Sequence, residues 1–196
     1  MKKLDYKLFN INPPKVKVKP GVLLVAPPYS TDLYFSKTVV LIVKHDDKGS
    51  IGFILNRPTE FMTEDMISEI SKFDSKIFFG GPVQVDSLHF IHKLGNKISD
   101  TEKVENDIYW GGSFETLYKL INEGKANPYN VKFFLGYSGW APNQLKNELE
   151  MDYWYVVPSN KYDIWADTSN LWKQVILDLG FNDKIIKNIP SDPMLN

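Results

Sequence analysis

One stretch of the sequence, residues 132–153, decides the fold, and it reads KFFLGYSGWAPNQLKNELEMDY. With the preceding valine it predicts a buried strand at Val131–Leu135, because apolar residues dominate there. Two glycines then bracket a predicted turn at Gly136–Trp140. A short helix is expected to open near Asn143, since two leucines repeat there at a spacing of four residues.

Side chains along this strand are expected to alternate between the two faces of a sheet. One face takes Val131, Phe133, Leu135 and Tyr137, and the other takes Phe134. Three earlier apolar runs without alternation predict further strands buried on both faces, at Val22–Ala26, Thr38–Val43 and Ile51–Leu55. The segment His45–Gly49, rich in Asp and Gly, predicts a hairpin turn between the last two runs.

Helical spacing of apolar residues predicts three more helices. They begin behind the possible caps Thr63, Ser113 and Ser169, and the last two end at Gly124 and Gly180. Further strands are expected at Ile77–Phe79, Leu88–His92 and Tyr153–Val157, and a surface loop at Lys93–Asp107. This order predicts a mixed α/β (α+β) fold, with a central, mostly buried β-sheet flanked by about four helices.

The length of 196 residues favours one compact domain. Residues 1–20, with three prolines, are interpreted as an extended lead-in, and residues 21–181 as the domain. Residues 182–196 are interpreted as an irregular tail.

Several separated motifs resemble one family of bacterial proteins. They are GVLLVAPP at residues 21–28, TVVLIVKH at 38–45, GFILNRP at 52–58, GGPV at 80–83 and LGYSGW at 135–140 with its QL and EL partners downstream. In this order they are similar to the AlgH/YqgE family, over roughly residues 21–180. The resemblance implies a compact α/β protein whose sheet curls toward a pseudo-barrel, a regulatory role proposed for some members, and no established catalytic residues.

Bulk composition excludes several classes of function. A formal net charge of −1 gives no long-range attraction to nucleic acid. The absence of Cys removes disulfides, thiol catalysis and Cys-ligated zinc, and is typical of a reducing compartment. No apolar run approaches the roughly 20 residues that span a bilayer. We therefore expect a cytoplasmic protein without membrane contact.

Potential catalytic residues do not form a complete motif. The serine-nucleophile pattern G-x-S-x-G requires glycine two residues after the serine, but residue 140 after Ser138 is Trp. His89 and His92 are three apart, so on a strand they point to opposite faces and cannot share a metal. Two acidic residues, Asp46 and Asp47, follow His45, and the preference of Asp for turns explains both of them. No catalytic residue, metal site or cofactor is therefore predicted.

Binding residues are predicted where strands end. Arg57 follows a buried strand and can present a planar fork to a carboxylate, a phosphate or a partner's backbone, although a local acid such as Glu60 could also occupy it. The Gly80-Gly81 turn lacks the spacing of a phosphate loop. The predicted site combines nine residues, which are Asn56, Arg57, Gly80, Gly81, His92, Gly136, Ser138, Gly139 and Trp140.

The leading functional hypothesis is a non-catalytic regulatory module that binds an unidentified small ligand or a protein partner. One alternative is a hydrolase, with or without a metal, that uses His45 or His92 with Asp46 or Ser138. The other is a DNA-binding transcriptional regulator, suggested by the role proposed for relatives. Nucleic acid stays an alternative partner that the net charge does not support.

Overall fold

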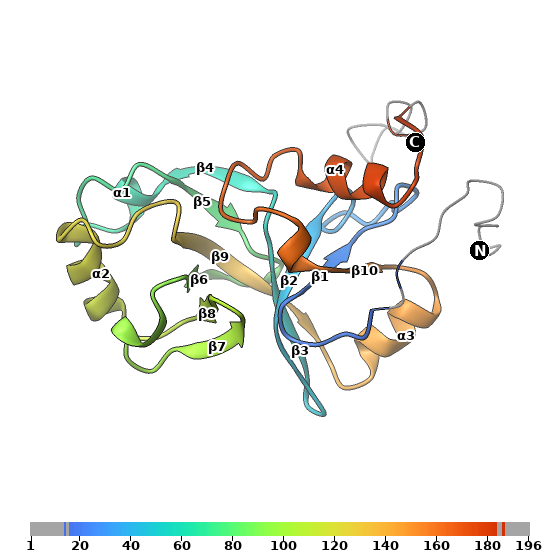
Figure 1. The fold of residues 1–196 in the computed structure, drawn as a ribbon, viewed down its shortest axis with the longest axis horizontal. Helices are drawn as coiled ribbons and strands as arrows, with labels where there is room; N and C mark the ends of the chain where they lie inside the picture. The colour runs from blue at the N-terminus through green and yellow to red at the C-terminus, as the bar shows by residue number, and fades with distance from the viewer. Residues whose placement is uncertain (1–13, 15, 184–185, 187–196) are drawn as a thin grey trace.

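A computed structural model describes residues 14, 16–183 and 186. Within them, ten strands form one curled sheet, a half-barrel, with four α-helices around it (Figure 1). The strands are β1 (Val22–Val25), β2 (Val39–Asp46), β3 (Gly49–Ile54), β4 (Pro58–Met62), β5 (Lys76–Phe79), β6 (Val83–His92), β7 (Glu102–Glu105), β8 (Ile108–Trp110), β9 (Val131–Trp140) and β10 (Tyr155–Pro158). The helices are α1 (Thr63–Met66), α2 (Phe114–Asn122), α3 (Gln144–Glu150) and α4 (Leu171–Asp178), with 3-10 turns at Gly95–Lys97 and Ser159–Lys161.

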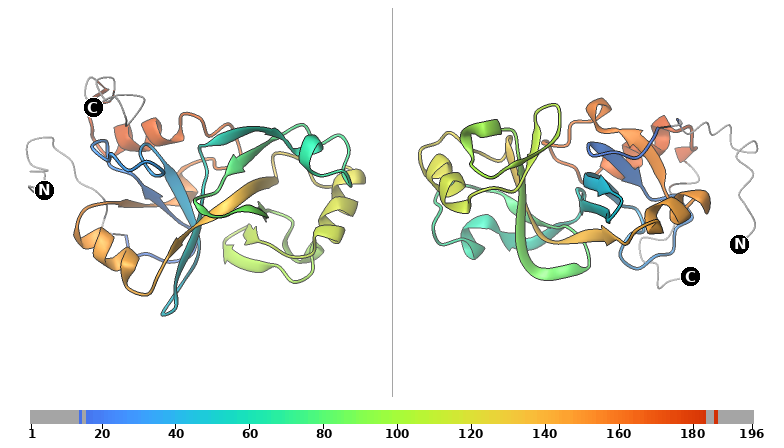
Figure 2. Two further views of the ribbon diagram at one scale, coloured as in Figure 1. Left: turned by 180° about the vertical axis from the view of Figure 1, so that it is seen from behind. Right: turned by 90° about the horizontal axis from the view of Figure 1, so that it is seen from below.

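The main path of the sheet runs β10-β1-β2-β3-β9-β6-β8-β7, and β5 joins β9 to β4. All pairs are antiparallel except the parallel pair of β5 and β9. Helices α1 and α2 lie at one end of the molecule and α3 and α4 at the other, as the views from behind and below also show (Figure 2). The predicted mixed α/β class and curled sheet are confirmed.

Strand β9 connects the two halves of the sheet. Its first half pairs with β5 and β6, and its last three residues pair with β3. The predicted turn at Gly136–Trp140 is therefore wrong, because the strand continues through it. Gly136 has φ +65°, and a Cβ there would lie 2.5 Å from the carbonyl oxygen of Gly81. The glycines thus permit a bend and a close backbone approach within a strand, not a reversal of the chain.

Three hydrophobic clusters fill the fold. The interior core lies inside the half-barrel under α4 and includes Leu23, Val25, Leu41, Phe53, Phe134, Val175 and Ile176. The α2 core includes Phe73, Ile77, Phe90, Leu117, Ile121, Val131 and Phe133. The α3 core includes Val22, Leu24, Val40, Ile42, Trp140, Leu145 and Trp154. Alternate residues of β1 and β2 enter different clusters, so both faces of these strands are covered, as their apolar runs predict.

The alternation predicted for β9 holds only as far as the bend. Phe134 faces the interior core, and Val131, Phe133 and Leu135 face the α2 core. Tyr137, expected beside them, instead packs against the interior core. The left-handed conformation of Gly136 shifts the alternation of the residues that follow it.

The helix predictions succeed where a cap and an apolar stripe agree. Helix α2 begins behind Ser113, whose hydroxyl accepts a hydrogen bond from the Thr116 N–H at 3.2 Å. Helix α1 is only four residues long, and the Thr63 hydroxyl donates to the carbonyl of Ser75 at 2.6 Å instead of capping it. A long helix behind Thr63 is therefore wrong, because this threonine ties its segment to the chain before β5.

The surface loop expected at Lys93–Asp107 is also only partly correct. It contains β7 and the buried side chains of Ile98 and Val104. Glu105 of β7 lies against the start of β1, since its carboxylate is 2.9 Å from the ammonium of Lys19. This contact helps to bring the β7 edge of the curled sheet toward β1. Most of the predicted lead-in 1–20 and tail 182–196 lies outside the described residues.

Candidate functional site

Four of the nine predicted site residues meet where β3, β5 and β9 converge. The carbonyl of Gly80 accepts hydrogen bonds from the Ile54 N–H and the Ser138 hydroxyl, both at 3.0 Å. A Cβ at Gly80 would lie 2.2 Å from the Gly136 oxygen, and one at Gly81 would lie 2.4 Å from the Ser138 nitrogen. These residues form a close backbone junction, and Ser138 is fully buried within it.

Asn56 and Arg57 lie beside this junction and hold the loop between β1 and β2. The Asn56 amide oxygen accepts from the Val39 N–H at 2.9 Å, and its nitrogen donates to the Lys37 carbonyl at 2.9 Å. Lys37, whose carbonyl accepts one of these bonds, has φ +56°. The Asn56 side chain therefore fixes a left-handed bend at the entry to β2.

Arg57 fixes the same loop by a second contact. Its Nη2 donates to the Ser36 carbonyl at 3.0 Å, so a backbone oxygen takes the place that Glu60 could have filled. Partial burial lowers the pKa of Arg57, and the charge of Asp32 opposes that shift. The guanidinium stays charged at neutral pH and lies beside an acidic loop residue.

The loop held in this way, residues 27–38, is called here the β1–β2 loop. The Asp32 carboxylate accepts from the N–H groups of Tyr34 and Phe35, both at 2.8 Å. The ring of Phe35 stacks on Trp140 with centroids 6.2 Å apart. Leu33 and Tyr34 remain 61% and 46% exposed. An internally bonded loop thus displays two large apolar side chains.

Trp140 packs beneath the β1–β2 loop, against Phe35. Its indole N–H and that of Trp154 both donate to Oε2 of Glu148, at 2.8 and 2.7 Å, and Gln144 donates to the other carboxylate oxygen. Trp140 is 5% exposed. It therefore supports the β1–β2 loop from the α3 core, whereas its neighbour Gly139 is exposed on β9.

His92 lies apart from the other predicted residues. It pairs with Val131 at the opposite end of β9 from Trp140, and its side chain is completely buried. Its Nδ1 accepts from the Leu94 N–H at 3.1 Å, so the proton is on Nε2, which lies 2.8 Å from the Thr101 hydroxyl. Burial lowers the pKa of His92 to about 4. The neutral ring completes a structural network.

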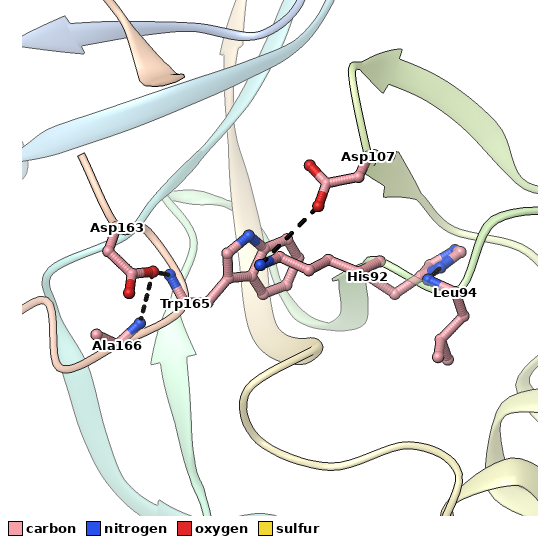
Figure 3. A network of polar contacts seen from close by, with 7 residues as sticks. His92, Leu94, Asp107, Asp163, Trp165 and Ala166 are labelled. Carbon is pink, nitrogen blue, oxygen red and sulfur yellow. Dashed lines mark hydrogen bonds and ion pairs between the residues drawn. The ribbon is translucent and has the colours of Figure 1, made fainter. Parts of the chain in front are cut away.

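Lys132 is a notable residue that sequence reasoning missed. It is 5% exposed, its ammonium donates to the Ala166 carbonyl at 3.1 Å, and it lies 4.4 Å from the centroid of the Phe78 ring. Burial lowers its pKa to about 8. Asp163 accepts hydrogen bonds from the N–H groups of Trp165 and Ala166, as Figure 3 shows, and so shapes the segment that carries the Ala166 carbonyl. The signal in the sequence that could have identified Lys132 is its place inside an otherwise apolar strand.

The hairpin of β2 and β3 carries Ser50, which sequence reasoning missed, beside His45, which it named for the hydrolase alternative. Nδ1 of His45 lies 2.7 Å from the Ser50 hydroxyl, beside a pocket of about 200 Å³ that Asp46, Asp47 and Lys146 also line. His45 is thus bonded to Ser50, and Ser138 is bonded to Gly80. Across the described residues, no group of three or more His, Cys, Asp and Glu side chains could hold a metal ion.

Replacing Asn56 by Ala is expected to lower the free energy of unfolding by about 1–3 kcal/mol. The change leaves the Val39 N–H and the Lys37 carbonyl without the partner they have now, in a partly buried place. Urea unfolding of the purified variant measures the effect. The exposed Asn160→Ala serves as control and is expected to change the free energy by less than about 0.5 kcal/mol. Equal effects of the two substitutions would contradict this role of Asn56.

Comparison with known proteins places this geometry in a family. Residues 23–184 match the DUF179 family, described as AlgH-like. A UPF0301 protein of Chlorobaculum parvum is 39% identical over 180 residues, which cover 91% of this chain and 96% of that protein. A UPF0301 protein of Cytophaga hutchinsonii is 39% identical over 178 residues, which cover 90% and 98%.

Two solved structures share the fold. The solution structure of the AlgH protein from Pseudomonas aeruginosa superposes with a TM-score of 0.67 at 23% identity, over 90% of this chain and 98% of that one. A crystal structure of a Corynebacterium diphtheriae protein gives a TM-score of 0.64 at 21% identity, over 91% and 100%. Within the described residues, no helix has the length and apolarity to cross a membrane. By its matched sequence and its relatives, the chain belongs to the AlgH-like family.

Proposed function

We propose that this protein is a binding module that contacts a protein partner through the β1–β2 loop and the adjoining residues 151–153. The observation that carries the proposal is the exposure of large apolar side chains on both segments. Leu33 and Tyr34 are 61% and 46% exposed, and Met151 and Tyr153 are 53% and 46% exposed. Exposed apolar side chains that gather on one surface are typical of protein contacts.

Contacts between the two segments support treating them as one surface. The Tyr29 hydroxyl donates to the Asp152 carbonyl at 3.3 Å, and Phe35 packs edge-on against Trp154 with centroids 5.4 Å apart. We call this region, residues 29–36 and 151–153, the loop surface.

Rigidity and composition favour a protein as the occupant. The Asp32, Asn56 and Arg57 bonds hold the backbone of the loop, so little conformational entropy is lost when it is bound. Aromatic and methionine side chains are enriched in protein interfaces, and this surface has both kinds. The net charge of −1 gives nucleic acid no comparable support. We place this contact in the cytoplasm and assign it a regulatory role, because a regulatory role is proposed for some members of the family.

Site-specific photo-crosslinking in the cells that make the protein tests this proposal. The photoreactive residue p-benzoylphenylalanine replaces Leu33 or Tyr153, and as control it replaces Tyr129, which is 77% exposed on the loop between α2 and β9. We expect one adduct of the same mass from the two loop-surface positions and none from position 129. The Arg57→Ala substitution is expected to weaken that adduct, because it frees the loop from its Ser36 contact.

Two results would contradict the proposal. One is the absence of any adduct at both loop-surface positions. The other is an equal adduct from position 129, which would indicate nonspecific contact.

A further inference from the structure

The β2–β3 hairpin holds a serine and a histidine in a fixed pair. His45 and Ser50 are direct cross-strand partners in this hairpin. The next pair, Asp46 and Gly49, lies at the turn. Nδ1 of His45 lies 2.7 Å from the Ser50 oxygen. Since directly paired residues share a face of the sheet, the backbone itself brings the two side chains together.

A β-bulge in β2 decides which face the pair occupies. Ile42 pairs with Gly52 but Lys44 pairs with Ile51, so Val43 is an extra residue. Without it, strict alternation would turn His45 toward the interior core. With it, His45 and Ser50 lie on the α3 side, where Ser50 also pairs with Trp140. Bulges that redirect a side chain occur often beside active sites.

The pair borders a pocket of suitable size and chemistry. The pocket has a volume of about 200 Å³, and its walls include Asp46, Asn143 and Lys146. Ser50 is 5% exposed, whereas His45 is exposed. The hydroxyl thus lies at the base of the pocket and the imidazole lies at its rim. A Cβ at Gly49 would lie 2.2 Å from the Trp140 carbonyl oxygen, so this close approach fixes the hairpin against β9.

We propose that Ser50 and His45 form a nucleophile and general-base dyad that cleaves small esters or thioesters with a short acyl group. The Ser50 oxygen bonds to the acyl carbon while its proton passes to His45 Nδ1. The bond from that carbon to the leaving oxygen or sulfur breaks, and the leaving group takes the proton from His45. Water then attacks the acyl-serine by the same route and restores the hydroxyl. Lys146 supplies positive charge near the oxyanion.

This chemistry goes beyond the loop surface and does not depend on it. It differs from the hydrolase alternative drawn from the sequence, because the serine is Ser50 and not Ser138. It would also add catalytic residues where the sequence predicts none.

Labelling with a fluorophosphonate probe tests the dyad on the full chain. The Ser50 oxygen attacks phosphorus, fluoride leaves, and peptide mass spectrometry locates the modified residue. We expect modification at Ser50, and an at least tenfold lower labelling rate in His45→Gln, since a positioned general base contributes about 10²–10⁴-fold. Hydrolysis of p-nitrophenyl acetate is expected to fall by the same factor. The exposed Ser68→Ala serves as matched control and is expected to keep both rates.

Folding of each variant is checked by its urea midpoint, so that a lost rate is assigned to the dyad only in a folded protein. Equal labelling rates in the parent and in folded His45→Gln would overturn the proposal, as would a prolonged reaction that leaves Ser50 unmodified. Crosslinking at the loop surface would be unaffected by either result, so failure of the dyad and failure of the partner contact are separable.

Discussion

Lowering the pH from 7 to 4 is expected to remove about 3 kcal/mol from the free energy of unfolding through His92 alone. The pKa of His92 falls from 6.5 to about 4 in the folded protein because burial disfavours its charged form. The unfolded chain therefore binds a proton at a higher pH than the folded chain. The contribution of the neutral ring is complete above pH 6.5 and is lost as the pH falls toward 4, at about 1.4 kcal/mol per unit of pKa difference.

The hydrogen bonds explain why His92 cannot take this proton in place. Its Nδ1 already accepts from the Leu94 N–H, and a second proton there would face that donor. Its Nε2 faces the Thr101 hydroxyl, which itself donates to the Trp110 carbonyl. The hydrogen-bond network therefore accommodates only the neutral ring with its proton on Nε2.

Urea unfolding at pH 7, 5.5 and 4 measures this effect in the parent and in His92→Gln. The glutamine removes the titrating group, so the difference between the two proteins isolates His92 from the carboxylates. We expect His92→Gln to be less stable at pH 7 and the difference to shrink by about 3 kcal/mol at pH 4. The exposed His45→Gln is the matched control. A difference that stays constant with pH would refute the assignment.

The sequence predicts elements well where local chemistry and burial agree. The hairpin of β2 and β3 has two apolar runs and an Asp/Gly turn, and α2 has both an apolar stripe and the Ser113 cap. It misleads at Gly136, because a glycine with positive φ suits a turn and a bend within a strand equally. Only the partners of β9, which are distant in sequence, distinguish these cases.

The candidate site shows the same limit. The sequence indicates that Asn56 and Arg57 stand at a strand end, but not that their partners are carbonyls of the β1–β2 loop. The contact of Gly80 with Gly136 and the separation of His92 from both depend on strand order. A bulge of one residue decides the face of His45, and no local signal in the sequence indicates it. The pairing of strands that are distant in sequence determines the geometry of the site, and no single sequence pattern encodes that pairing.

Raising the pH from 7 to 10.5 is expected to stabilise the parent protein relative to Lys132→Met by about 3 kcal/mol. Burial lowers the pKa of Lys132 to about 8 from 10.5, with the charges of Asp167 and Asp163 opposing the shift. Between about pH 8 and pH 10.5, which are the pKa values of Lys132 in the folded and the unfolded chain, the unfolded chain holds a proton that the folded chain has lost. Stability from this group therefore increases with pH and is complete above 10.5.

The environment of Lys132 supports this direction. No carboxylate within 4.0 Å pairs with its ammonium among the described residues, which hold it by one carbonyl and one aromatic ring. At pH 7 the buried charge costs free energy, so Lys132→Met is expected to be at least as stable as the parent.

Urea unfolding of both proteins at pH 7, 8.5 and 10.5 follows the difference, in which other titrating groups cancel. Lys125→Met, whose side chain is 63% exposed, controls for the loss of one lysine and is expected to show no comparable trend. If Lys132→Met were less stable than the parent by the same amount at every pH, the ammonium would not change its protonation on folding. The contact with Ala166 would then act as an ordinary hydrogen bond, since only a group whose pKa differs between the folded and unfolded chain makes stability depend on pH.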